Sequence, residues 1–118
     1  MKRELSNNAK EKIKELASKE AEHGKEACGL VVDDGDDFLN IYECFNSAID
    51  NKNNYVISIN DFIAAENIGE VVGVYHSHPN GENKGFSQGD MINSNKLDLI
   101  NFLYEVETDK FYTFYPEE

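Results

Sequence analysis

The sequence predicts an α/β fold: one domain over residues 1–118, with a mixed sheet of about six strands flanked by helices. Apolar residues near the start recur at three-to-four spacing, the period of an amphipathic helix. Farther along, short β-branched or aromatic runs are separated by clusters of turn-forming residues, which is typical of strands. A hydrophobic content of 40% in 118 residues is enough for a single modest core, and no internal repeat or linker divides the chain.

The first predicted elements are a helix and a hairpin. Residues 8–23 carry the helical apolar pattern, and Gly24 suits the left-handed backbone that commonly ends a helix. The start of this helix can be capped by any of three polar residues, Ser6, Asn7 or Asn8. Residues 27–32 and 38–45 are expected to form two strands, and the turn residues 33–37 between them predict a hairpin.

A loop, a strand and a short helix are expected in the middle of the chain. Residues 46–54 are polar and predict a loop, and residues 55–59 predict a short strand. Asn60 is expected to cap a brief helix that Gly69 ends. Residues 71–78 are largely apolar and β-branched, which predicts a further strand.

The last third of the chain is predicted to contain a loop, a helix and a second hairpin. A Gly-rich loop over residues 80–86 leads to Ser87, which is expected to cap the helix. The polar run that follows breaks the apolar spacing of a long helix, so we expect the helix to end near residues 96–98. Residues 102–106 and 111–115 are aromatic and β-branched and predict a hairpin.

The charge and hydrophobic composition of the chain limit the kinds of binding partner and the cellular compartment that we expect. The chain has 23 acidic and 11 basic residues, a net charge of −12, which argues against nucleic acid and anionic membrane surfaces as partners. No apolar run approaches the ~20 residues of a membrane span, and the start lacks the apolar core of a signal peptide. We therefore expect a cytoplasmic protein in which Cys28 and Cys44 are buried, reduced thiols.

Two histidines and an aspartate have the pattern of a metal site. His76 and His78 lie two residues apart at the end of a predicted strand, so both imidazoles point to one face and Ser77 points to the other. Asp90 falls in the first turn of the following helix, which a loop can fold back toward the strand end. Two imidazoles and one carboxylate, with a fourth position left to water, match a catalytic zinc site.

Two questions stay open when the residues are considered alone. Ser87 and Asp90 have the spacing of a capping box, so they can serve only to start a helix, although Asp90 can cap and bind a metal together. Hydrolysis at a zinc site also needs a general base. Spacing alone does not distinguish Glu26 from the other acidic residues for this role.

The motif resembles the signature of a known enzyme family. The run His-Ser-His-Pro at residues 76–79, followed at fixed spacing by Ser87 and Asp90, resembles the signature of the JAMM (JAB/MPN) zinc metalloproteases. The run Glu-Ala-Cys-Gly-Leu at residues 26–30 resembles the upstream element of the same family. The resemblance implies a JAB/MPN-like domain with a cytidine-deaminase-like layout.

The resemblance to the JAMM family also implies a role for each residue of the motif. His76, His78 and Asp90 are expected to bind one zinc ion per chain. Glu26 is expected to act as the general acid/base on the zinc water. Ser87 is expected to stabilise the oxyanion of the tetrahedral intermediate.

A closer resemblance is to the N-terminal peptidase domain of phage tail assembly protein K. It implies peptide or isopeptide hydrolysis in phage tail assembly, with a tail protein as substrate, in the host cytoplasm or on the virion. A cell-wall hydrolase domain of the NlpC type would be a partner in trans. Two alternatives are a bacterial JAMM peptidase that processes a ubiquitin-like or sulfur-carrier tail, and a non-catalytic, metal-binding tail assembly module. The shared features are residues 26–29, Tyr42, Cys44, Asn46, residues 57–58, Phe62, residues 64–66, Gly69 and residues 73–79.

Overall fold

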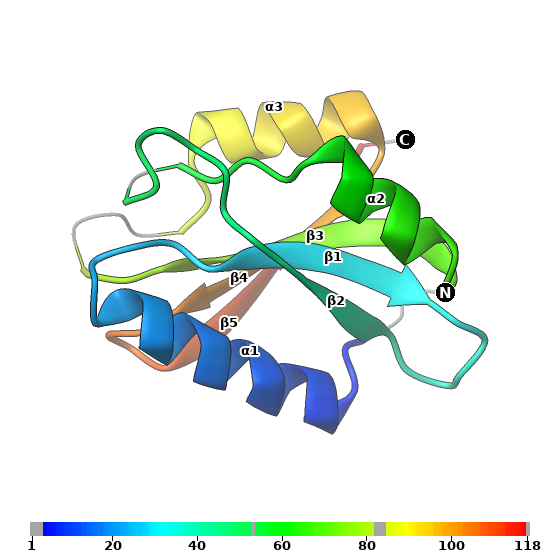
Figure 1. The fold of residues 1–118 in the computed structure, drawn as a ribbon, viewed down its shortest axis with the longest axis horizontal. Helices are drawn as coiled ribbons and strands as arrows, with labels where there is room; N and C mark the ends of the chain where they lie inside the picture. The colour runs from blue at the N-terminus through cyan, green and yellow to red at the C-terminus, as the bar shows by residue number, and fades with distance from the viewer. Residues whose placement is uncertain (1–3, 53, 82–84, 118) are drawn as a thin grey trace.

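Five strands form one mixed sheet in the order β2-β1-β3-β4-β5 (Figure 1). The computed structural model describes residues 4–52, 54–81 and 85–117. β3 and β4 run parallel, and the other neighbouring pairs run antiparallel. The strands are β1 (Cys28–Asp33), β2 (Asn40–Cys44), β3 (Glu70–His78), β4 (Ile100–Glu105) and β5 (Lys110–Phe114). The α/β class and both predicted hairpins are confirmed, and the five strands are close to the expected six.

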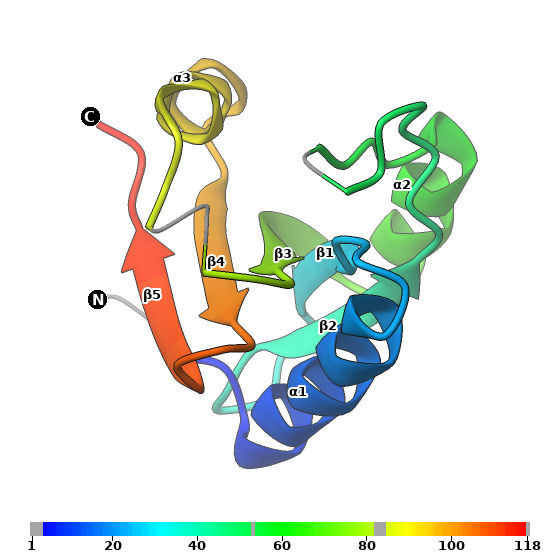
Figure 2. The same cartoon turned by 90° about the vertical axis from the view of Figure 1, so that its left-hand side faces the viewer.

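Helices cover both faces of the sheet. α1 (Asn7–Ala21) packs on one face, and α2 (Ile59–Glu66) and α3 (Gln88–Leu97) lie over the other (Figure 1, Figure 2). Ser6 caps α1, because its hydroxyl oxygen accepts the Ala9 N–H at 3.0 Å. Within the part of the chain that the structure describes, no helix is long and apolar enough to cross a membrane.

The prediction of a strand at residues 55–59 is wrong. The Val56 N–H donates to the Asn46 side chain at 3.2 Å, and the Val56 carbonyl accepts the Ser47 N–H at 3.0 Å. The backbone of this segment therefore bonds to the preceding loop and not to the sheet. Alternate side chains of the segment still pack toward the core, which gives the segment the sequence pattern of a strand.

The boundaries of the two shorter helices depend on their caps. Ser58 caps α2 by accepting the Asp61 N–H at 3.2 Å, so the expected cap Asn60 lies inside the first turn. α3 ends at Leu97, and Asp98 follows in the left-handed conformation with a φ of 55°. The predicted end of this helix near residues 96–98 is confirmed.

Gly29 on β1 leaves room for a tyrosine ring of the neighbouring strand β3. This glycine lies opposite Tyr75, and a Cβ atom on it would lie 2.2 Å from the Tyr75 ring and 2.5 Å from the Tyr42 carbonyl oxygen. The Tyr75 ring thus occupies the space that a side chain at position 29 would need. It belongs to the core on the α1 face, whose buried members include Ala9, Ile13, Val31, Leu39, Tyr75, Phe102 and Tyr104.

The core on the opposite face of the sheet is smaller and contains both cysteines. Its buried members are Cys28, Leu30, Val32, Cys44 and Ala65. Cys28 and Cys44 lie opposite each other on β1 and β2, and both are free thiols, as expected. Burial raises the pKa of each thiol to about 12, so both stay protonated and unreactive at neutral pH.

Candidate metal centre

β3 delivers two histidines to the same face of the sheet. The side chains of His76 and His78 are 1% and 5% exposed, and their ring centroids lie 5.1 Å apart. Ser77, between them, is fully buried and points to the opposite face, as the alternation of side chains along a strand requires. Both imidazoles therefore face the layer that contains α2 and α3.

Ser77 fixes the segment that carries Glu26. The Ser77 N–H donates to the Ala27 carbonyl at 3.0 Å, and the Ser77 Oγ accepts the Ala27 N–H at 2.8 Å. These bonds extend the β1–β3 pairing by one residue and bring Glu26 beside the histidines. The Glu26 side chain is buried, and its carboxylate forms one group with His76 and His78, whose ligand atoms all lie within 4.8 Å of one another.

Asn46 holds the backbone of Glu26 from the other side. Its side-chain amide donates to the carbonyl oxygens of Glu26 and Asn54, both at 3.0 Å. Its Oδ1 accepts the N–H groups of Ala48 and Val56 at 3.1 and 3.2 Å. One side chain therefore ties the loop before α2 to the segment that carries the buried carboxylate.

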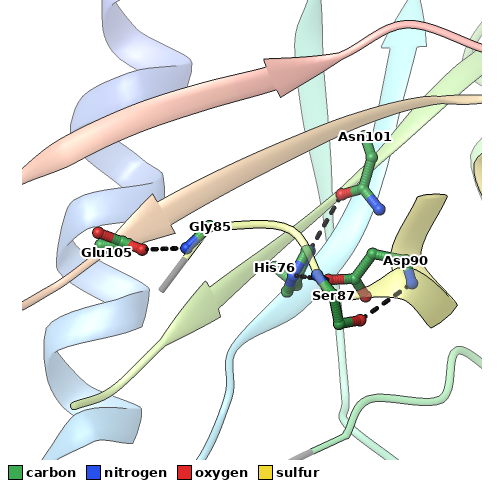
Figure 3. A network of polar contacts seen from close by, with 6 residues as sticks. All are labelled: His76, Gly85, Ser87, Asp90, Asn101 and Glu105. Atoms are coloured by element: carbon green, nitrogen blue, oxygen red, sulfur yellow. Dashed lines mark hydrogen bonds and ion pairs between the residues drawn. The ribbon is translucent and has the colours of Figure 1, made fainter. Parts of the chain in front are cut away.

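α3 presents Asp90 to His76 from its first turn (Figure 3). Oδ2 of Asp90 lies 3.3 Å from Nε2 of His76 and also accepts the Ser87 N–H at 2.9 Å. Ser87 Oγ accepts the Asp90 N–H at 3.0 Å, which completes a capping box. Asp90 therefore both caps α3 and faces His76. Burial alone would raise the pKa of Asp90, but its contacts with His76 and Ser87 outweigh burial and lower the pKa to about 2.

Asn101 and Tyr55, which the sequence reasoning missed, orient His76. Asn101 is buried on β4, and its Oδ1 lies 3.0 Å from Nδ1 of His76 (Figure 3). Because an amide oxygen only accepts hydrogen bonds, Nδ1 carries the proton and Nε2 keeps its lone pair in the neutral ring. The Tyr55 ring stacks on the same imidazole, with centroids 4.7 Å apart and 20° between the planes. The available signal for Asn101 was a single amide near the start of a strand that is otherwise apolar up to its last residue, Glu105.

Glu105, also missed, anchors the loop that leads to α3. Its carboxylate accepts the Gly85 N–H at 2.6 Å (Figure 3). It also accepts the Thr108 hydroxyl at 3.2 Å. Gly85 has a φ of 67°, a left-handed conformation that favours glycine. Glu105 also lies beside His78 in the register of β3 and β4. The buried Glu105 carboxylate of β4 thus holds Gly85, two residues before the helix cap Ser87.

The donor atoms fit a small divalent cation. Nε2 of His76 and Oδ2 of Asp90 lie 3.3 Å apart. Without an ion a protonated Nε2 can donate to Asp90 across this distance, and in the tautomer with the proton on Nδ1 both atoms offer lone pairs to one ion. Two ligands each about 2.0 Å from a tetrahedral zinc ion lie ~3.3 Å apart, so this separation suits a shared ion. Burial, followed by the negative charges of Asp90 and Asp50, raises the pKa of Glu26 to about 8. Across the described residues no Lys or Arg pairs with Glu26 or Asp90, so a cation would relieve this repulsion.

The site opens into a groove of about 780 Å³ between α2 and α3. Glu26, His78, Ser87 and Asp90 line one end of the groove. Ser87 is exposed, and its hydroxyl oxygen accepts the capping hydrogen bond, so its proton is available for another acceptor. A carbonyl group that lies over the histidines would therefore meet a hydrogen-bond donor at Ser87.

A mixed sheet with two strand histidines, a helix-borne aspartate and a buried glutamate presents a group of donor atoms that could hold a metal ion. A family model described as prokaryotic homologs of the JAB domain matches residues 10–112, and the chain belongs to this family. A comparison with curated proteins finds no match for the chain. The family match supports the JAB/MPN resemblance, while the closer likeness to phage tail assembly protein K stays a prediction.

Replacing Asn101 with Leu is expected to release the His76 ring. The buried Nδ1–H would lose its acceptor, so the free energy of unfolding of the metal-free protein should fall by about 1–3 kcal/mol. The imidazole should also become a mixture of both neutral tautomers. Denaturant titration measures the first effect, and the ¹⁵N chemical shifts of the imidazole measure the second.

The matched control for this experiment is Asn93→Leu. Asn93 is an exposed amide on α3 that lines the same groove, so its replacement should leave both measurements unchanged. A His76 ring that stays fully protonated at Nδ1 in Asn101→Leu would show that Asn101 does not set the tautomer.

Proposed function

We propose that the chain is a zinc-dependent peptidase or isopeptidase of the JAMM type. The observation that carries this proposal is the buried Glu26 carboxylate beside His76 and His78, with Asp90 facing His76. The family match supports it, because the family includes metallo-isopeptidases. His76, His78 and Asp90 would hold the ion, which when bound activates water and polarises the scissile carbonyl.

The remaining residues of the site would move protons and stabilise charge. A carboxylate oxygen of Glu26 would accept the proton of the attacking water and pass it to the nitrogen of the leaving amine. The hydroxyl of Ser87 would donate a hydrogen bond to the carbonyl oxygen as negative charge builds on it. Asn101 and Tyr55 would keep the His76 ring in one orientation throughout.

Zinc content tests the proposed metal ligands. Purified chain is expected to contain about one zinc ion by elemental analysis, and His78→Ala should lose most of it because one of the buried nitrogen donors is gone. His23→Ala is the matched control, since His23 is exposed and lies outside the site, and it should keep its zinc. Full zinc content in His78→Ala would contradict the assignment of the ligands.

Glu26→Gln separates metal binding from catalysis. Glu26→Gln keeps the size of the side chain but cannot accept the proton, so zinc should stay while peptide hydrolysis falls by at least ~10²-fold. The control is Glu22→Gln, an exposed residue at the end of α1, which should hydrolyse at the wild-type rate. Equal activity of Glu26→Gln and wild type on a pooled peptide library would place the base elsewhere.

We also propose that the natural substrate is a flexible segment of a phage tail protein. The resemblance of residues 26–29 and 73–79 to the peptidase domain of phage tail assembly protein K supports this choice. Between Glu26 and His76 the described residues form two strands, a loop, α2 and the next strand. Among them we find no separate insertion that would grip a folded ubiquitin.

Cleavage of tail proteins encoded beside this gene tests the choice of substrate. Zinc-loaded chain is expected to cut a tail protein at a discrete site, identified by mass spectrometry, and to cut ubiquitin-like tail fusions only weakly. Glu26→Gln serves as the blank in both reactions. Brisk cleavage of the fusions together with intact tail proteins would reject the phage substrate and favour a processing peptidase.

A further inference from the structure

The groove at the metal centre has a second, apolar end that the proposed chemistry does not use. Glu26, His78 and Asp90 line its polar end, whereas six apolar side chains from α2, α3, the sheet and the connecting segments line the rest of it, together with polar residues such as Asn93 and Asn101. The apolar residues are Leu30 of β1, Ile57, Phe62 of α2, Val74 of β3, Leu97 of α3 and Leu99. Both ends belong to one continuous cavity of about 780 Å³, so a molecule that reaches the polar end also meets the apolar one.

The register of the sheet sets the distance between the two ends. Val74 and His76 lie on the same face of β3, two residues apart, which corresponds to about 7 Å along a strand. Each residue of an extended peptide spans about 3.5 Å. A peptide whose carbonyl lies over His76 therefore places a side chain one or two residues away against the apolar end.

The charge of the groove favours an apolar occupant over an acidic one. Among the described residues that line it, none is Lys or Arg, and its polar end carries Glu26 and Asp90. The chain as a whole has a net charge of −12. A carboxylate at the apolar end would lose its hydration without gaining a cationic partner, whereas a branched or aromatic side chain would cover Phe62, Val74 and Leu99.

We infer that the apolar end is a specificity pocket for a large hydrophobic side chain of the peptide substrate, within two residues of the scissile bond. This inference rests on the proposed peptidase function and adds the class of sequence that is cut. The side chains that fit are those of Leu, Ile, Met and Phe, and Asp and Glu are excluded. Leu97 forms the exposed wall of the pocket, and Leu30 and Val74 form its floor.

Cleavage of an internally quenched peptide library by the zinc-loaded full chain tests the pocket. Peptides with Leu or Phe one or two residues from the cut are expected to have kcat/KM at least about tenfold higher than those with Ala or Asp there. Equal rates for Leu, Ala and Asp at every position around the cut would overturn the inference and leave the peptidase function standing.

Two substitutions on α3 localise the preference. Leu97→Lys places a charge in the pocket wall and should reduce the preference for Leu over Asp by about tenfold or more. Ile92→Lys makes the same change at a similarly exposed position of the helix that does not line the groove, and it should keep the wild-type preference. An equal loss of preference in both variants would attribute the effect to net charge and reject the pocket.

A binding measurement separates the pocket from catalysis. Zinc-loaded Glu26→Gln is titrated with a Leu-containing peptide and its Asp counterpart, and amide chemical shifts are followed by NMR. The Leu peptide is expected to shift Phe62, Val74 and Leu97, and the Asp peptide is not. If no peptide is cut by the wild type, this selective binding still supports the pocket while the peptidase proposal fails. Identical shifts with both peptides would overturn the pocket.

Discussion

Two hydrogen bonds between Ser77 and Ala27 hold the metal centre together. The histidines come from the end of β3 and the buried carboxylate comes from the residue before Ala27, so the two groups meet only where these strands stay paired. The Ser77 backbone N–H donates to Ala27, and the Ser77 hydroxyl oxygen, which lies on the face opposite the histidines, accepts the Ala27 N–H. Because the bonds are buried, loss of the hydroxyl would leave the Ala27 N–H unsatisfied, at a cost of about 1–3 kcal/mol. The serine between the two histidines is thus a structural part of the motif.

One face of the sheet carries the larger hydrophobic core, and the other face carries the groove and the candidate metal centre. The α1 face has a closed core in which Tyr75 lies over Gly29. On the other face, α2 and α3 stand apart over the sheet and leave the groove between them (Figure 2). The groove can remain open because the opposite face supplies most of the buried hydrophobic residues. The strands β1 and β3, which carry the site, therefore pack on their opposite face against a closed core.

The sequence predicted the local features of the fold and the site well. The alternation of side chains correctly placed His76 and His78 on one face, and the capping pattern correctly placed Asp90 in the first turn of α3. Glu26 was singled out by resemblance only, because its position beside the histidines arises from strand pairing across 50 residues of sequence. Asn101 and Glu105 were missed for the same reason, since each acts on a partner in another element.

The error at residues 55–59 has a different physical cause. Alternation shows that every second side chain is buried, but it does not show which backbone the segment pairs with. Here the side-chain oxygen of Asn46 accepts the Val56 N–H, which a carbonyl of a neighbouring strand would otherwise have accepted. The segment instead covers the metal centre, where Tyr55 stacks on His76. A half-buried amide side chain that can replace a strand partner leaves no periodic signal in the sequence.

The capping role of Asp90 couples the start of α3 to whatever ion the site holds. The same Oδ2 atom accepts the Ser87 N–H and faces His76, so an ion bound to this oxygen and to His76 would tie the first turn of α3 to β3. α3 buries only Ser94 of its described side chains, so few buried side chains hold it to the sheet. Occupancy of the centre and order of the helix are then thermodynamically linked, with each raising the stability of the other. Since α3 forms one wall of the groove, binding of an ion would also order that wall.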